Sequence, residues 1–76
     1  MNKQRRKTLN ELYDKLAELR DLLDEVKCEE EDYRDNMPEN LQNSERYEIA
    51  ENACDNMASA LSSLEEALDY IESATE

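Results

Sequence analysis

The chain has 76 residues, a net charge of −12, and no Gly, His, Trp or Phe. Without His it lacks the usual general base and the commonest metal ligand, and without Gly it has no phosphate-binding Gly-rich loop, so we expect neither an enzyme nor a metal or cofactor site. A chain of this length makes one domain at most, and the excess of carboxylates repels nucleic acid and anionic membranes.

The first seven residues form a basic segment that differs from the rest of the chain. They contain four basic side chains, among them Arg5 and Arg6, and no acid, whereas residues 8–76 hold 5 basic and 21 acidic side chains. The segment lacks the apolar core of a signal peptide, and no apolar run approaches membrane-spanning length. We therefore expect a cytoplasmic protein with reduced thiols.

Apolar residues in the first half recur at alternating intervals of three and four. The stripe continues through Glu30, Tyr33 and Met37, and its first members are Leu9, Leu12, Leu16, Leu19, Leu23 and Val26. This heptad pattern predicts a helix over residues 3–34. We expect Glu30, the polar interruption, to snorkel past a small neighbour; the alternative is a register-fixing role or a contact to a second subunit.

Residues 35–44 interrupt the heptads and predict a connector. Pro38 suits the first position of a short helical turn with Met37 as its N-cap, and Leu41 then turns inward with Met37. We expect Asn40 or Asn43 to adopt left-handed backbone angles, and Ser44 or Asn43 to cap the next helix. Two interpretations stay open, a turn alone or a recognition surface. The candidate binding residues are Asn36, Asn40, Gln42, Arg46 and Tyr47, with Arg5 and Arg6 as cationic candidates elsewhere.

A second heptad stripe predicts a helix over residues 45–74. Its members are Tyr47, Ala50, Cys54, Met57, Leu61, Leu64, Leu68 and Ile71. Two helices of similar length joined by a short connector favour an antiparallel hairpin. Pairing residues whose numbers sum to 80 matches the two stripes throughout, and it places Glu30 opposite Ala50 and Tyr33 opposite Tyr47 as the last core layer. The predicted fold is an all-α helical hairpin, a two-helix coiled coil.

A second row of mostly small side chains runs beside the stripe of the later helix. Alanine recurs every seven residues, and a hairpin alone would leave this row in water. We predict that two copies associate, most simply as a four-helix bundle, through Ile49, Ala53, Ala60, Ala67, Tyr70 and Ala74. The alternative is that alanine serves only as a good surface helix former.

The two cysteines and the acidic run offer no site chemistry. Cys54 falls on the core stripe and Cys28 on the outer side of its helix, so we expect no intrachain disulfide and no zinc site. The acidic run over residues 29–35 lacks the alternating ligands and the Gly of a calcium-binding loop.

The stretch "DNMPENLQNSER" and the alanine-rich "AENACDNMASALSSLEEALDYIE" resemble a group of small uncharacterised acidic helical-hairpin proteins of Gram-positive bacteria and their phages or prophages. The resemblance covers nearly the whole chain and implies a mobile-element setting, in which small acidic proteins often block host factors.

Three functions follow from these features. The first is a non-enzymatic binding protein that blocks a host protein with a basic surface, with a defence system as one candidate target. The second is an oligomeric sink for a small anionic signalling nucleotide, and the third is a structural or regulatory coiled-coil module.

Overall fold

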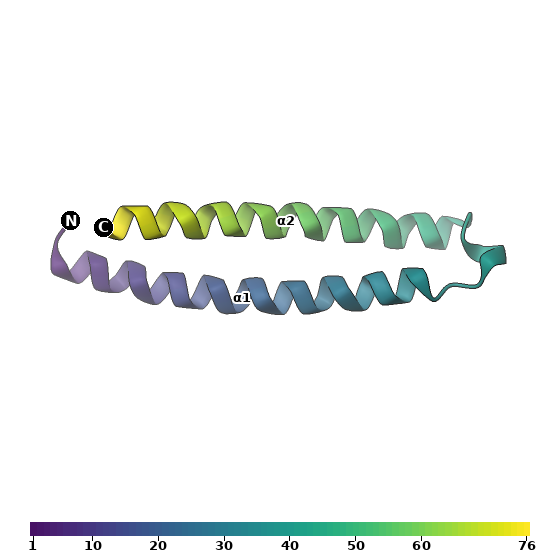
Figure 1. Ribbon diagram of the computed structural model, residues 1–76, viewed down its shortest axis with the longest axis horizontal. Coiled ribbons are helices and arrows are strands. Elements are labelled where there is room, and N and C mark those ends of the chain that lie inside the picture. Colours follow the sequence, from purple (N-terminus) through teal and green to yellow (C-terminus); the bar gives the residue numbers. More distant parts are fainter.

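The computed structural model describes all 76 residues and shows two long helices folded back on each other (Figure 1). Helix α1 spans Lys3–Asp35 and helix α2 spans Glu45–Thr75, with a short 3-10 helix, η1, at Glu39–Leu41 between them. The molecule measures 59 × 14 × 13 Å, and both termini lie at the end opposite the connector. The predicted all-α antiparallel hairpin is confirmed.

Side-chain caps set the start of each helix. The Asn2 side chain accepts a hydrogen bond of 2.7 Å from the backbone N–H of Arg5. Ser44 caps α2 by accepting from the N–H of Tyr47 at 3.3 Å, while its hydroxyl donates to the carbonyl of Leu41. Each bond satisfies a backbone donor that a helix end leaves unpaired. The prediction that Ser44 or Asn43 caps α2 is therefore confirmed for Ser44.

The core stripe of α2 lies where its heptads predict. Ala50 and Leu68 are 1% and 2% exposed, Cys54 is also buried, and the remaining members of the stripe are half-buried. This single row of side chains faces α1 along the whole hairpin.

Helix α1 is turned about its axis relative to the prediction. Four residues expected in the core are exposed by 44–56%, and they recur every seven residues: Leu12, Leu19, Val26 and Tyr33. The residue that follows each of them is half-buried instead: Tyr13, Arg20, Lys27 and Arg34. Long basic side chains can cover apolar surface with their stems while their charged ends stay in water. The expected core role of the four residues is therefore wrong.

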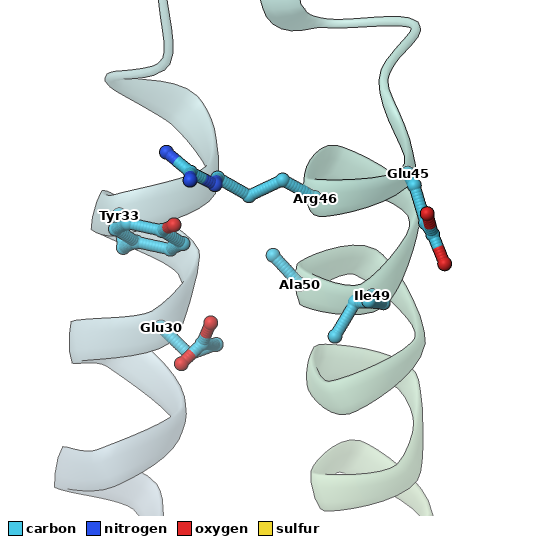
Figure 2. Close-up of a pocket in the computed structure, with 6 residues that line it drawn as sticks. All are labelled: Glu30, Tyr33, Glu45, Arg46, Ile49 and Ala50. Carbon is cyan, nitrogen blue, oxygen red and sulfur yellow. The ribbon is translucent and has the colours of Figure 1, made fainter.

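The predicted alignment along the hairpin axis is retained. Glu30 and Ala50 line one cavity, as the sum-of-80 pairing requires, and Arg6 bonds to the carbonyl of Thr75. Glu30 reaches from α1 toward the buried Ala50 and is itself half-buried (Figure 2). The two helices thus have the predicted register but a different rotation of α1.

The connector differs from the prediction in its capping, its backbone angles and its packing against the core. Pro38 precedes η1 rather than starting it, and Met37 is buried beside a half-buried Leu41. No residue has a positive φ, so the left-handed angles predicted for Asn40 or Asn43 are wrong. Because Tyr33 is 48% exposed, it does not form the last core layer with Tyr47, and Met37 closes the core instead.

Candidate binding surfaces

The hairpin has two long faces, which the rotation of α1 makes chemically different. One face contains a small cavity lined by Arg20, Asp21, Asp24, Leu61 and Glu65. Because residues seven apart stack on one side of a helix, Lys27 and Glu31 extend this face along α1, and Glu72 extends it along α2. We call this side the polar face.

Few of the carboxylates on the molecule are paired. The three ion pairs are Arg20–Asp21 at 3.2 Å, Lys27–Glu31 at 3.7 Å and Arg34–Asp35 at 2.9 Å. They engage three of the 21 acidic side chains, and two of the pairs join neighbours in the sequence. Partly exposed pairs of this kind contribute about 0–1 kcal/mol each. Two of the pairs lie on the polar face, where they leave Asp24, Glu65 and Glu72 without a basic partner, so this face has a net negative charge.

The opposite side, which we call the apolar face, carries the large side chains that the core leaves out. On α1 it consists of Leu12, Leu19, Leu22, Val26 and Tyr33, which are all 44% exposed or more. On α2 it consists of the row of residues predicted for self-association. Tyr33 and Ile49 line one cavity, which shows that the two rows lie on the same side of the hairpin.

Exposure varies along the predicted self-association row. Ile49 and Tyr70 are the most exposed large side chains of α2, at 62% and 72%, and Ala60 and Ala74 are also exposed. Ala53 and Ala67 are half-buried at the edge of the core. The row is thus open to a partner along the whole length of α2.

At the connector end the apolar face opens into a cavity of about 670 Å³. Figure 2 shows Arg46 extending from α2 across to Tyr33 on α1, with Glu30 one turn below. The other lining residues are Glu45, Ile49 and Ala50. Two carboxylates and one guanidinium give the cavity a net negative charge, which disfavours an anionic ligand.

The predicted binding residues of the connector do not form one cluster with a common partner. The side chains of Asn36, Asn40 and Gln42 are exposed and make no hydrogen bond within the protein. Arg46 lies in the cavity of the apolar face, whereas Tyr47 is half-buried in the core stripe. The structure therefore brings Arg46 to Tyr33 and leaves the three amides facing solvent.

Arg5 and Arg6 lie at the other end of the rod. Arg6 donates from Nε to the carbonyl of Thr75 at 3.1 Å and from Nη2 to the carbonyl of Met1 at 3.4 Å. The first bond satisfies a carbonyl in the last turn of α2, where a positive charge is favourable. The seven predicted binding residues are thus divided between two ends of a molecule 59 Å long.

Both cysteines are free thiols in different surroundings. Burial raises the pKa of the Cys54 thiol, and nearby Arg34 partly opposes this effect. Cys28 is exposed. The hydrogen bond that the Arg34 guanidinium donates to the carboxylate of Asp35 in turn raises the pKa of Arg34. Cys54 therefore acts as a small neutral core residue.

The apolar row of α1 is the surface that sequence reasoning missed. The signal was present, because α1 carries apolar residues outside its heptad stripe, including Tyr13, Ala17 and Leu22. Such a helix has an apolar surface wider than a single partner helix can cover. The heptad rule assigns this width to a single seam, although part of it faces away from α2.

Comparison with family models, with curated proteins and with solved structures finds no match. The structure contains no group of His, Cys, Asp or Glu arranged to hold a metal ion, and neither helix has an apolar stretch long enough to cross a membrane.

Proposed function

We propose that this protein is a non-enzymatic binding protein whose acidic helical surface occupies a basic surface of another protein. The observation that carries the proposal is the polar face, where Asp21, Asp24 and Glu65 surround one cavity and only Asp21 has a basic partner. Opposite charge speeds association and selects among partners more than it raises affinity.

The rod-like shape supports this proposal. A hairpin 59 Å long presents its carboxylates in a row, spaced by the helical repeat, rather than in a pocket. A row of this kind suits an extended basic groove, such as one that binds nucleic acid in the partner. In the mobile-element setting that the resemblance implies, this partner is a host factor, and the protein blocks it in the cytoplasm as a homodimer.

A binding experiment with neutralised carboxylates tests the role of the polar face. The tagged protein is used to capture partners from a lysate of the host bacterium at 50 mM salt, a concentration at which charge screening is weak, and the bound protein is identified by mass spectrometry. The triple variant Asp21→Asn, Asp24→Asn, Glu65→Gln should lose most of this binding. For the wild type, binding should weaken steeply as salt is raised toward about 500 mM, because added ions screen exposed charges.

A second triple variant serves as the matched control. Asp35→Asn, Glu39→Gln and Glu45→Gln remove the same three charges at the connector end and should leave partner binding nearly intact. Affinity that does not respond to salt would rule out the acidic-surface mechanism. Equal loss in both triple variants would show that net charge, and not the polar face, governs binding.

A further inference from the structure

We propose that the apolar face is the contact surface for a second copy of this chain, packed about a two-fold axis perpendicular to the helices, with the two connectors at opposite ends of the bundle. The inference rests on the dimer of the proposed function and names its surface and symmetry. It is independent of whether the polar face binds a basic partner.

The size of the apolar face matches what a stable dimer needs. One long side of the hairpin measures 59 × 14 Å, which corresponds to about 800 Å², the area that each partner contributes to a standard interface. Only four of the 76 residues are buried within the hairpin. A chain this small commonly completes its core by association.

The distribution of charge favours association of two copies through the apolar face. Residues that stack with Leu12 and Leu22 on α1, and with Ile49 and Ala53 on α2, include one acid, Glu29, and three bases, Arg5, Lys15 and Arg46. Glu30 and Glu45 add two carboxylates at the cavity of the connector end. The remaining surface holds almost all of the 21 carboxylates. Two such chains therefore repel each other everywhere except across the apolar face.

The row on α2 has a similar order of residue types in both directions from its centre. A two-fold interface requires that if residue i contacts residue j, then j contacts i. Residues at equal distances on either side of Ala60, to within one residue, pair by chemistry: Ala53 with Ala67, Asn56 with Ser63, and Ile49 with Tyr70. Ala53 would thus meet Ala67, polar side chains would meet each other, and Ile49 would meet Tyr70. Beyond these pairs, Ala74 would lie opposite Arg46.

The row on α1 has the same property about a centre at Leu22. Leu19 lies as far from this centre as Val26 does, to within one residue, and Lys15 lies as far from it as Glu29. An antiparallel pairing of α1 with its copy therefore joins Lys15 of one chain to Glu29 of the other. They have opposite signs and are the two charges of the α1 row between Leu12 and Tyr33.

One axis can serve both helices because the two centres lie at the same level of the hairpin. Leu61, next to Ala60, shares a cavity with Arg20, Asp21 and Asp24, which bracket Leu22 in the sequence. The alternative axis, parallel to the helices, places α1 of one copy on α2 of the other. That packing would leave Lys15 and Glu29 against the alanine row without partners of opposite charge.

The end charges favour the same arrangement. The connector end is strongly acidic, with Glu29, Glu31, Asp32 and Asp35 within two turns, whereas residues 1–7 at the other end are basic. Connectors at opposite ends bring the acidic end of one chain beside the basic segment of its partner. Connectors at the same end would place like charges together.

Distances between spin labels test the arrangement in the full-length protein. In a background of Cys28→Ser and Cys54→Ala, a label at Asn40→Cys should report a distance near or above the 59 Å length of the hairpin. A label at Ser59→Cys, in the middle of α2, should report about the width of the bundle, since neighbouring helices pack 8–10 Å apart. A short distance at both positions would overturn the proposed symmetry.

Cross-linking gives a second, independent readout. In the same background Ala60→Cys lies at the axis and should form an intermolecular disulfide under mild oxidation, whereas Ala58→Cys, on the opposite side of the same helix, should not. Equal cross-linking of both variants, or a monomeric mass for the unlabelled protein, would overturn the dimer inference. Salt-sensitive binding to a basic partner, measured separately, would in that case leave the acidic-surface proposal standing.

Discussion

The two long faces of the hairpin are built from the same two helices but have opposite chemistry. The polar face combines half-buried basic side chains with an excess of carboxylates, whereas the apolar face exposes Leu19 by 56% and Tyr70 by 72%. The difference shows that the apolar residues of this chain form two surfaces. One joins α1 to α2, and the other faces outward.

The largest expected effect is the loss of stability when a leucine of the core, compared with one of the apolar face, is replaced by alanine. Leu68→Ala should lower the free energy of unfolding by about 2–5 kcal/mol, because the side chain is 2% exposed and leaves a cavity. Leu12→Ala removes the same atoms from a side chain that is 44% exposed in the hairpin. Its cost should be smaller in dilute protein and should rise with protein concentration, as expected when a dimer buries it.

Denaturant unfolding at two protein concentrations checks this pair of variants. A Leu12→Ala cost that is small and the same at both concentrations would contradict burial of Leu12 in a dimer.

A carboxylate introduced on one or the other face of α2 tests which face mediates self-association. Ala60→Glu should weaken self-association at least about 100-fold, which corresponds to roughly 3 kcal/mol, because it buries an unpaired carboxylate between two acidic chains. Ala58→Glu makes the same substitution two residues away on the polar side and should leave association unchanged. Analytical ultracentrifugation measures both, with circular dichroism to show that helix content is retained. Equal weakening by the two variants would count against the apolar face as the interface.

A moderate effect on stability is expected at the connector end, where Ser44 caps α2 and so supports both faces. Ser44→Ala should cost about 1 kcal/mol of stability, because the N–H of Tyr47 loses its capping acceptor. Ser62→Ala, at an exposed position within α2, should be neutral or slightly stabilising, since alanine is the better helix former. Thermal unfolding of the two variants compares them, and a neutral Ser44→Ala would argue against the capping role.

The smallest expected effect concerns the buried thiol. Burial raises the pKa of Cys54 above its ordinary value of 9.0, so the folded state favours the neutral thiol. The unfolded chain ionises first as the pH rises, and the folded state therefore loses stability above about pH 9. Unfolding measured from pH 7 to pH 10 should show a steeper decline for the wild type than for Cys54→Ala. Parallel declines would mean that other groups cause the loss.

The sequence predicted the hairpin and the core stripe of α2 because both depend on one strong periodic signal. The stripe of α2 is bordered by charged residues on one side and by small residues on the other, so only one rotation buries Cys54, Leu64 and Leu68 together. The alignment along the axis followed from the lengths of the two helices and their connector.

The rotation of α1 was not predictable from the same rule. Leu22, Tyr13 and Ala17 widen its apolar surface, so two neighbouring rotations bury similar areas against α2. In the structure Arg20, Lys27 and Arg34 are half-buried, with their stems against α2. The heptad rule counts these three residues as polar positions that face outward. Counting charged residues as always outward therefore moved the predicted seam by one position.

The candidate site was less predictable than the fold, because binding residues need no period. The amides of the connector looked surplus to a turn, and in the structure they do face solvent without partners inside the protein. Arg46, one of the candidate binding residues, shares its cavity with Glu30 and Glu45. The proximity of those two carboxylates depends on how the chain turns between the helices, which sequence spacing did not reveal.

The backbone of the connector has a consequence for how this protein can diversify. Every residue there adopts torsion angles that any L-amino acid tolerates, since none has a positive φ. Exposed positions such as Asn36, Asn40 and Gln42 can therefore change without a conformational penalty, while Met37 and Ser44 hold the turn in place. The backbone conformation therefore places little restriction on sequence variation at the tip of the rod.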